Sequence, residues 1–345
     1  MYFLKKEDRV VTLRMIAEKC GVSVATVSKA LNGADDLSES TIERIRQVAN
    51  SLGYMPNAAA RALKTSRSYS FGVIYEEALK YGLTHEFFSR ILNSFMTRSQ
   101  SFGYDMFFIG DRLADRDITY AEHARYRNCD GVLVIAGTDR AERATEKLSA
   151  DDFPIVCIDY EVPGFSSVLS DNARGVRDLV LYAHGLGHRK IAFVHGEDTR
   201  VTRIRVDAFR QVCGELGLSL PGSYVIEARY HDADRVEKAA YRLLDLPDPP
   251  TCILFPDDVS YVGALNAFTE RGLCVPRDVS VMGYDGVELG QLTRPRLTTL
   301  RQNAEAMGAA AAEILVRAAE AGDGYQPERV VIPGKLQPGG TVRRL

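Results

Sequence analysis

Residues 12–32 carry small, polar and basic side chains at spacings that suit contact with an extended anion. Four such side chains recur every three or four residues: Ala25, Ser28, Lys29 and Asn32. A helix would place them on one face. Hydroxyl and ammonium groups on such a face can bond phosphate oxygens, and Lys29 could also donate to the O6 and N7 atoms of guanine. The pattern therefore indicates DNA recognition.

Two short helices around a tight turn are predicted to hold these side chains in place. The first helix has one apolar face, formed by Leu13, Ile16, Ala17 and Cys20. Thr12 can cap its start, Gly21 ends it, and Ser23 can cap a second helix. That second helix turns three residues inward: Val27, Ala30 and Leu31. A helix held in this way is the element that a helix-turn-helix places in the major groove, although an ordinary helical hairpin has the same spacing.

A third helix and a linker are expected to follow. The helix begins at Ser38 or Ser40 and ends at Gly53, which gives a headpiece over residues 10–55. Residues 56–69 contain an alanine-rich run that favours helix by propensity but is too short to be stable alone in water. This linker therefore needs a partner in order to fold.

The charge and the cysteines indicate a cytoplasmic protein that binds phosphates with its N-terminal part. Up to Ser70 there are eleven Lys and Arg against seven Asp and Glu, a balance of +4, whereas the whole chain carries −3. The six Cys form no C-x-x-C pair, and several stand in apolar runs, which indicates reduced core residues. No apolar run reaches the ~20 residues of a membrane span, and the first residues do not resemble a signal peptide.

From residue 71 onward, predicted strands and helices alternate, which favours a parallel α/β core. The strands are expected at residues 71–75, 105–109, 132–136, 155–159, 191–195, 252–255 and 279–282. The clearest helix is 86–102, where an apolar stripe ends at Gly103.

Polar side chains at the ends of these strands are candidates for a ligand site, because open α/β sheets bind ligands beyond the carboxyl ends of their strands. Four residues stand at or just after such ends: Tyr75, Asp159, Asp257 and Asp285. Asp171 and Arg205 are expected to begin or line helices nearby. Each has a structural alternative, because Asp also caps helices and Arg pairs with Asp.

The sequence resembles the lactose-repressor (LacI) family along nearly its whole length. In the N-terminal part the match is Gly-Val-Ser-Val-Ala-Thr-Val-Ser-Lys-Ala-Leu-Asn-Gly from residue 21, with Ile16-Ala17 before it and Tyr54-x-Pro56-Asn57 after it. Core motifs are Asp171-Asn172, Gly187-His188-x-Lys190-Ile191-Ala192, Arg203-x-Arg205, Asp257-Asp258, Val275-Pro276-x-Asp278, Gly283-Tyr284-Asp285 and Leu297-Thr298-Thr299.

The resemblance implies a fold as well as a division into lobes. It implies an all-α helix-turn-helix headpiece plus an α/β two-lobed periplasmic-binding-protein-like (type I) core with parallel sheets, in which three strands cross between lobes. The core would cover residues 70–345. Lobe 1 would take about 70–185 and 301–329, and lobe 2 about 186–300 and 330–345.

The resemblance also implies DNA contacts. Residues 56–69 would hold a hinge helix that pairs with a second copy over the minor groove and inserts Leu63 into the central base step. The residues that would contact the base edges are Val24, Ala25 and Lys29. The remaining implied contacts are Thr12, Leu13, Ser23, Thr26, Ser28, Asn32, Ser38, Thr41, Tyr54, Asn57, Ala60 and Lys64. The hydroxyls among them can equally cap helices.

In the core the resemblance implies a small-molecule effector, a sugar or sugar derivative, bound between the lobes. Its hydroxyls would be held by Asp171, Arg205, Asp257 and Asp285, with Phe87, Phe88 and His231 against the ring. Tyr75, at its strand end, is a further candidate for the same site. Two features depart from the family. Asp257 stands where Asn is common, and the usual Arg of the C-terminal signature is missing from residues 336–341. No leucine-heptad tail follows, so a homodimer is expected.

The sequence contains no G-x-S-x-G, P-loop, G-x-G-x-x-G or H-E-x-x-H motif, so we predict no enzyme, metal site or cofactor. We predict a transcriptional regulator, a repressor, that binds a palindromic double-stranded DNA operator and changes its DNA affinity when the effector binds. Two alternatives stay open: a sugar-binding receptor or enzyme without DNA function, and a DNA-binding regulator controlled by a protein corepressor.

Overall fold

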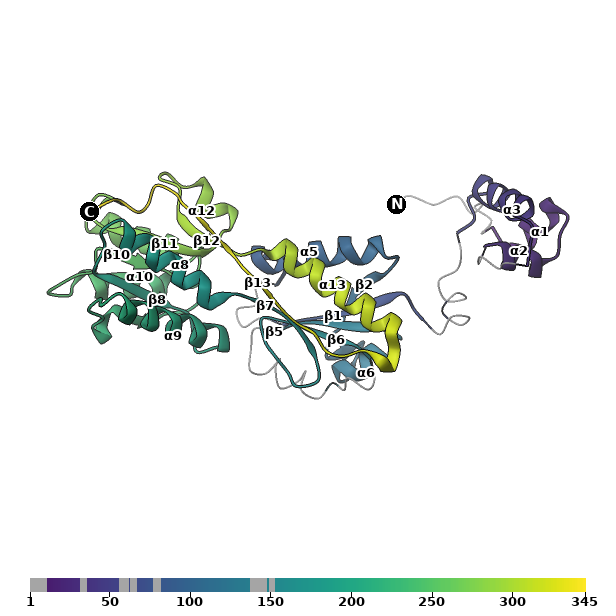
Figure 1. The fold of residues 1–345 in the computed structure, drawn as a ribbon, viewed down its shortest axis with the longest axis horizontal. Helices are drawn as coiled ribbons and strands as arrows, with labels where there is room; N and C mark the ends of the chain where they lie inside the picture. Colours follow the sequence, from purple (N-terminus) through teal and green to yellow (C-terminus); the bar gives the residue numbers. More distant parts are fainter. Residues whose placement is uncertain are drawn as a thin grey trace. The chain divides into compact units, whose positions relative to one another are not determined.

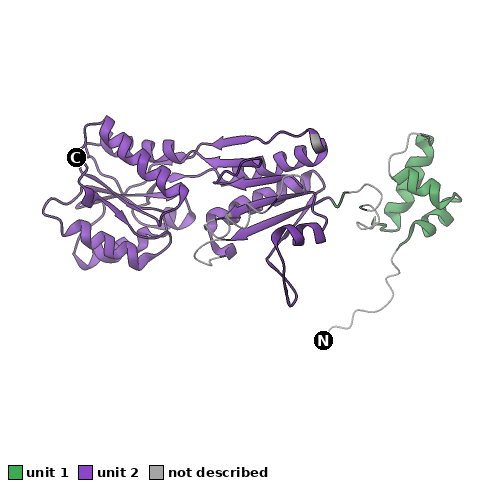
Figure 2. Cartoon of the chain, turned by 90° about the horizontal axis from the view of Figure 1, so that it is seen from below, with its two compact units in different colours: residues 1–68 green, residues 69–345 purple. Residues whose placement is uncertain are grey.

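Two compact units make up the chain, residues 1–68 and residues 69–345 (Figure 2). The computed structural model describes residues 11–31, 36–55, 62, 67–76, 82–136, 148 and 153–345. Each unit has its own hydrophobic core. None of the helices in these described ranges is long and apolar enough to cross a membrane.

Three helices form the described part of the first unit: α1 (Leu13–Cys20), α2 (Val24–Leu31) and α3 (Glu39–Ser51). Their shared core includes Ile16, Val27 and Ile45, which are fully buried. Gly21 ends α1 with a left-handed φ of 64°, a conformation that glycine adopts without steric cost. This sharp stop allows α2 to begin at Val24 and pack against both neighbours.

The second unit consists of two lobes, each built on a six-stranded sheet in the described residues. In lobe 1 the strand order is β13-β7-β6-β5-β1-β2, and all neighbours are parallel. The strands are β1 (Ser70–Glu76), β2 (Asp105–Phe108), β5 (Gly131–Ala136), β6 (Ile155–Ile158), β7 (Ser166–Ser170) and β13 (Arg329–Ile332). A small hairpin follows β2, formed by β3 (Arg112–Leu113) and β4 (Arg116–Asp117).

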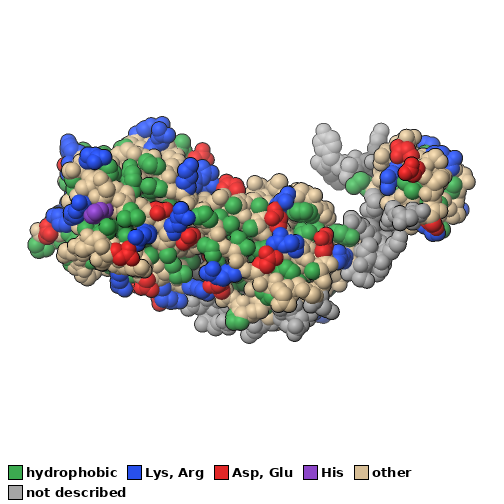
Figure 3. Space-filling view, viewed as in Figure 1, with side chains coloured by type: hydrophobic (Ala, Val, Ile, Leu, Met, Phe, Trp, Pro, Cys, Tyr) green, Lys and Arg blue, Asp and Glu red, His purple; other side chains and the backbone are tan. Residues whose placement is uncertain are grey.

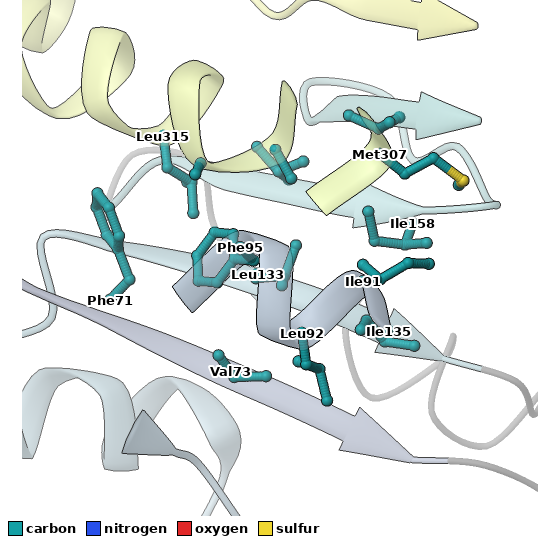
Figure 4. Packing of buried hydrophobic residues seen from close by; sticks show 14 of the residues in the cluster. Phe71, Val73, Ile91, Leu92, Phe95, Leu133, Ile135, Ile158, Met307 and Leu315 are labelled. Carbon is teal, nitrogen blue, oxygen red and sulfur yellow. The ribbon is translucent and has the colours of Figure 1, made fainter. Parts of the chain in front are cut away.

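Helices α5 (Glu86–Ser101) and α13 (Ala304–Ala321) cover one face of the lobe 1 sheet, and α6 (Tyr120–Tyr126) covers the other (Figure 1). Figure 4 shows how the first face is filled. Ile91 and Phe95 of α5 and Leu315 of α13 pack over Leu133 and the neighbouring strand residues. These side chains bury the apolar stripe that the sequence predicted for α5.

Lobe 2 has the strand order β14-β12-β11-β10-β8-β9, with β14 antiparallel to β12 and the other neighbours parallel. Its strands are β8 (Ile191–His195), β9 (Val225–Glu227), β10 (Cys252–Leu254), β11 (Ser280–Asp285), β12 (Thr298–Arg301) and β14 (Lys335–Gln337). Four helices pack on it: α8 (Asn172–Gly185) and α9 (Arg200–Glu215) on one face, α10 (Ala233–Leu244) and α11 (Tyr261–Glu270) on the other. The shorter elements are α12 (Glu288–Leu292) and the 3-10 turns η1 (Gly82–Thr84), η2 (Gly222–Tyr224) and η3 (Gly322–Gly324).

The predicted fold class is confirmed, but two lobe boundaries differ from the prediction. We expected residues up to 185 in lobe 1, yet α8 packs with α9 on the lobe 2 sheet because Val176, Leu179 and Ala183 form its apolar stripe. We expected residues from 330 onward in lobe 2, yet β13 pairs in parallel with β7 of lobe 1. Val330 and Ile332 of that strand pack against the lobe 1 core.

Candidate DNA-binding face and effector site

Helix α2 presents the residues that were predicted to read bases. Val24 is 45% exposed, and Ala25 and Lys29 are exposed as well. On the opposite face, Val27 and Ala30 are fully buried. Because the buried face fixes the rotation of α2 about its axis, the exposed face is held in one orientation, as groove recognition requires.

Three of the predicted contact hydroxyls also cap helices. The hydroxyl oxygens of Thr12, Ser23 and Ser38 accept from the backbone N–H three residues later, at 3.4, 3.0 and 3.4 Å. Those of Ser23 and Ser38 also lie 2.8 Å from the hydroxyls of Thr26 and Thr41. Capping leaves a hydroxyl able to bond a phosphate oxygen, and helix N-termini attract phosphate. The structural role and the predicted DNA role are therefore compatible.

Lys29 supplies the positive charge of α2. Its Nζ pairs with the carboxylate of Asp36, and both side chains are 54% exposed. The hydrogen bond from Lys29 lowers the pKa of Asp36. An exposed ion pair of this kind is weak, so the Lys29 ammonium can exchange Asp36 for a guanine edge or a phosphate. Asp36 thus orients Lys29 in the free chain.

The other predicted DNA contacts fall into two groups. Leu13 and Tyr54 pack against the headpiece core, and Ser28 is half-buried on α2. The remaining ones lie outside the described residues: Asn32, Asn57, Ala60, Leu63 and Lys64.

In the second unit, Arg205 of α9 is a buried cation without an ion pair in the described part of the chain; it is 4% exposed. Its Nε donates to Oδ1 of Asn172 at 2.7 Å, and its Nη1 donates to the carbonyl of Pro256 at 3.2 Å. Its guanidinium carbon lies 3.6 Å from the centroid of the Tyr284 ring. Burial lowers the pKa of Arg205, whereas the nearby Tyr and Asp residues raise it. The pKa is raised on balance. Arg205 therefore stays charged and keeps donor capacity for a ligand oxygen.

Two carboxylates from different lobes act on this cation. Asp285 at the end of β11 accepts from Nε2 of Gln302 at 2.7 Å, and Asp159 after β6 accepts from the backbone of Ser170 at 2.6 Å. Burial raises the pKa of both carboxyl groups, and the charge of Arg205 opposes this. Their φ angles are left-handed, 94° and 60°. Such backbone strain in non-glycine residues gathers at functional sites.

His85 and His231 stack across the lobe boundary, with ring centroids 4.3 Å apart and planes inclined by 33°. His85 precedes α5 of lobe 1, and His231 follows β9 of lobe 2. Nε2 of His231 lies 3.9 Å from Oδ1 of Asp257. Burial, together with the charge of His231, lowers the pKa of His85 to about 4, so its ring is neutral at pH 7. The ring centroid of Phe88 lies 4.5 Å from that of His85, and the ring centroid of Tyr75 lies 6.0 Å from that of Phe88.

Three predicted effector residues have structural partners. Asp257 accepts from both the backbone N–H and the hydroxyl of Ser260 at 2.7 Å, which ties it to the turn before α11. Asp171 caps α8 by accepting from the helix backbone at 3.2 Å. Phe87 is 4% exposed in the lobe 1 core, whereas Phe88 lies at the lobe boundary. The structural alternative for the two Asp residues thus has direct support.

Sequence reasoning gave no role to four residues of this site. Asn172 and Tyr284 stand inside motifs that it did quote, so their proximity to Arg205 had a signal. His85 and Gln302 had no signal in the sequence, because their contacts with His231 and Asp285 arise only in the folded chain. The described residues contain no cluster of His, Cys, Asp and Glu that could hold a metal ion.

The segment that lacks the signature Arg borders a hollow of about 580 Å³. Its lining combines residues 338–340 with Gln291, Arg294 and Arg296. A Cβ at position 339 would lie 2.1 Å from the carbonyl oxygen of Arg296, so this backbone accepts only glycine there. Two arginines from the stretch before β12 thus bring positive charge to the corner where the signature Arg is missing.

Both units match known protein families. A model described as "Bacterial regulatory proteins, lacI family" matches residues 12–57, and one described as "Periplasmic binding protein-like domain" matches residues 180–342. The chain belongs to the lacI family. This lacI-family protein is therefore a DNA-binding transcriptional regulator and not an enzyme.

Curated relatives of this lacI-family chain are named as repressors. One is the probable HTH-type transcriptional repressor ExuR of Bacillus subtilis (strain 168), 28% identical over 89% of this chain and 91% of the relative. Another is the HTH-type transcriptional repressor CytR of Escherichia coli (strain K12), 29% identical over 86% of each chain.

Solved structures share the fold of this lacI-family chain. The lac repressor dimer bound to operator and the anti-inducer ONPF has a TM-score of 0.78 at 24% identity, covering 97% of this chain and 100% of the other. The complex of the transcriptional regulator CelR with cellobiose has a TM-score of 0.69 at 24% identity, covering 96% and 99%.

Proposed function

We propose that this chain represses transcription in the cytoplasm by binding a palindromic DNA operator as a homodimer. The observation that carries this proposal is the exposed outer face of α2, on which Val24, Ala25 and Lys29 are available while the opposite face is buried. Two copies related by a twofold axis would present two such helices to half-sites one helical turn apart. The names of the relatives ExuR and CytR support repression.

We also propose that a small polyhydroxylated molecule, a sugar or sugar derivative, binds at the lobe boundary and controls operator affinity. Arg205 can donate to a ligand oxygen. Asp285 can accept from a ligand hydroxyl through Oδ2, because the hydrogen bond from Gln302 engages Oδ1. Phe88 and the stacked His85 and His231 offer flat surfaces to a sugar ring. The cellobiose in the CelR complex supports this ligand class by analogy.

The charge balance of the site favours an uncharged effector. Arg205 faces the carboxyl groups of Asp159 and Asp285, Asp257 adds a further carboxyl group near Asp285, and His85 is neutral. A sugar acid or sugar phosphate would bring a further negative charge next to these carboxyl groups, which disfavours its binding in a buried site. Neutral sugars avoid that repulsion.

Selection from random DNA, followed by titration of the selected sequence, tests the DNA-binding half of this proposal. We expect a palindromic consensus bound by two chains. A site without twofold symmetry, or binding by one chain, would contradict the proposed homodimer.

A thermal-shift screen of neutral sugars, uronic acids and sugar phosphates tests the effector half. A ligand at 100 times its Kd adds about 2.7 kcal/mol to the unfolding free energy. Stabilisation by the anionic members alone would overturn the neutral assignment. If no small molecule stabilises the chain while a protein partner changes operator binding, the corepressor alternative replaces the effector.

A further inference from the structure

Glu161 joins the two lobes through an ion bridge with two arginines. It follows β6 in lobe 1, and its Oε1 accepts from Nε of Arg329, the first residue of β13 in the same lobe, at 2.6 Å. Its Oε2 accepts from Nη2 of Arg200, the first residue of α9 in lobe 2. One arginine therefore anchors the carboxylate within lobe 1, and the other ties it to lobe 2.

Most other ion pairs of the described second unit stay within one lobe. On the face shown in Figure 3, acidic and basic side chains are interspersed over both lobes. Arg177 with Glu215 and Arg203 with Asp198 are examples inside lobe 2. Arg301 of β12 and Glu305 of α13 also form an ion pair across the lobes, at 3.8 Å, but they are only four residues apart in the chain. The bridge at Glu161 joins segments that are distant in the chain, so it breaks when the lobes separate.

The bridge has features that make it stronger than an isolated surface pair. Glu161 is 29% exposed and Arg200 is 42% exposed, so solvent screens the charges only in part. The hydrogen bond from Arg329, with the charge of Arg200, lowers the pKa of Glu161, which keeps the carboxylate ionised. Arg329 also holds the Glu161 side chain in place, so less rotamer freedom is lost when Arg200 binds it.

A second contact ties the lobes at another point. The carboxylate of Glu86, in the first turn of α5, accepts from the backbone N–H of Glu288 in α12 at 3.0 and 3.1 Å. Glu161 and Glu86 follow β6 and β1, which lie on either side of β5, while Arg200 and Glu288 follow β8 and β11, on either side of β10. Two contacts that are separated by a strand in each sheet resist rotation of one lobe against the other.

We propose that the Glu161–Arg200 ion pair is an interlobe latch that sets the population of this lobe arrangement before any effector binds. A ligand shifts an equilibrium only by its differential affinity for the two states. A weaker latch therefore changes how far a given effector shifts the lobes, although Glu161 and Arg200 do not belong to the proposed effector site. The consequence for DNA binding rests on the proposed function, whereas the latch itself does not.

Single-molecule energy transfer between the lobes of the full chain, with no DNA and no effector, tests the latch. Cys274 of lobe 2 is exposed and the other five cysteines are buried. A second label enters lobe 1 through Ser101→Cys at the exposed end of α5. Labelled chains are diluted into unlabelled chains so that a dimer reports one pair of dyes.

Arg200→Gln is compared with the control Arg203→Gln, which breaks a 2.8 Å ion pair inside lobe 2 on the same helix. We expect Arg200→Gln to lower the ratio of chains at the wild-type lobe distance to chains at other distances about two- to fivefold, which corresponds to about 0.5–1 kcal/mol. Arg203→Gln should leave the distance distribution unchanged. Arg200→Lys, which keeps the charge, should restore part of the population, and high salt should reduce the difference between the two glutamine variants.

Identical distance distributions for Arg200→Gln and Arg203→Gln would overturn the latch. Thermal unfolding of both variants shows whether a difference reflects the lobes or the fold. Operator binding by the wild-type chain is measured separately. A wild-type chain that binds no operator would refute the proposed function. The latch would still be tested by the lobe distances alone.

Discussion

At the scale of single residues, Lys29 has two competing partners, Asp36 in the free chain and DNA in the proposed complex. Lys29→Ala is expected to cost about 1–3 kcal/mol on the preferred operator and to relax sequence choice at one position per half-site. Titrations of the selected operator and its single-base variants measure both effects. A uniform loss on every sequence would make Lys29 a phosphate contact.

The matched variant is Asp36→Asn, which removes the pairing charge and keeps Lys29. We expect it to raise affinity for all DNA sequences and to leave sequence choice unchanged, because Asp36 acts on the availability of the ammonium and not on base readout. A change of sequence choice in this variant would assign Asp36 itself to the DNA interface.

His85 makes the fold sensitive to acid. Its pKa falls from an ordinary 6.5 to about 4 on folding, so the unfolded chain binds this proton more readily. The stabilisation is fully present above about pH 6.5 and is lost as the pH falls toward 4. His85→Phe should therefore flatten the loss of unfolding free energy over this range, by up to roughly 3 kcal/mol. Urea unfolding at several pH values tests this, and equal slopes for both chains would contradict it.

The residues that could be predicted from sequence are those whose role follows from local position. Thr12 and Ser38 were identified because capping depends on the next few residues. Asp285 was named as a candidate because it was expected to follow a buried strand, and it does lie at the end of β11. His85 was missed because its role depends on stacking with His231 in the other lobe, which no local pattern encodes.

At the scale of elements, the contact between α5 and α13 depends on one glycine. A Cβ at Gly308 of α13 would lie 2.2 Å from the carbonyl oxygen of Ile91 and 2.8 Å from the backbone nitrogen of Phe95, so the two helices would have to separate. Gly308→Ala is expected to destabilise the core by about 1–3 kcal/mol despite the better helix propensity of Ala. Chemical denaturation measures the change.

Gly214→Ala in α9 is the control, because nothing lies within 4 Å of the added Cβ. The same substitution should stabilise the chain there by up to about 1 kcal/mol. If the two variants were equally stable, the close approach of α5 and α13 would not limit residue 308.

The sequence predicts that residues 56–69 hold a hinge helix that is too short to be stable without a second copy. Leu63→Ala should leave the core folded and effector binding intact, yet weaken operator binding and reduce DNA bending, because it removes only the apolar wedge. Energy transfer between dyes at the two operator ends measures the bend. Unchanged bending by this variant would remove Leu63 from the central base step.

Most central strands were predictable, and β2 at one edge was predicted too, whereas β7, β9, β12, β13 and β14 were missed. β1, β5, β6 and β8 are continuous apolar runs because helices bury both faces of the sheet. β12, β13 and β14 are short and partly polar, and their pairing depends on distant strands. β11 was expected to end at Met282 but continues to Asp285, which pairs with Arg301 of β12.

At the scale of the whole molecule, the chain passes between the lobes three times, from β7 to α8, from β12 to α13 and from β13 to β14. Each passage is a short connection between well-packed elements, and such connections serve as hinges when lobes move as rigid bodies. Because Arg205 lies in lobe 2 and Asp159 lies in lobe 1, a ligand between them would favour one lobe arrangement.

Linkage then fixes how the proposed effector and the operator affect each other. If the effector-bound arrangement separates the two hinge segments of a dimer, the effector weakens DNA binding by some factor, typically 5- to 150-fold, and operator DNA must weaken effector binding by the same factor. If that arrangement brings the segments together, the coupling free energy changes sign, each ligand strengthens the binding of the other by the same factor, and the effector acts as a corepressor. Calorimetric titrations of the effector with and without operator, and of the operator with and without effector, measure the two factors, which must agree.

Arg205→Ala and Asp285→Asn should abolish this response while operator affinity without effector stays nearly unchanged. Asp285→Asn is the conservative variant, since the Gln302 amide can still donate to the side-chain carbonyl of Asn. Arg205→Ala removes a buried cation together with its bonds to Asn172 and Pro256, so its folding is checked by thermal unfolding. Wild-type effector affinity in both variants would take Arg205 and Asp285 out of the site, because a ligand that touched either group would lose at least one charge-assisted hydrogen bond.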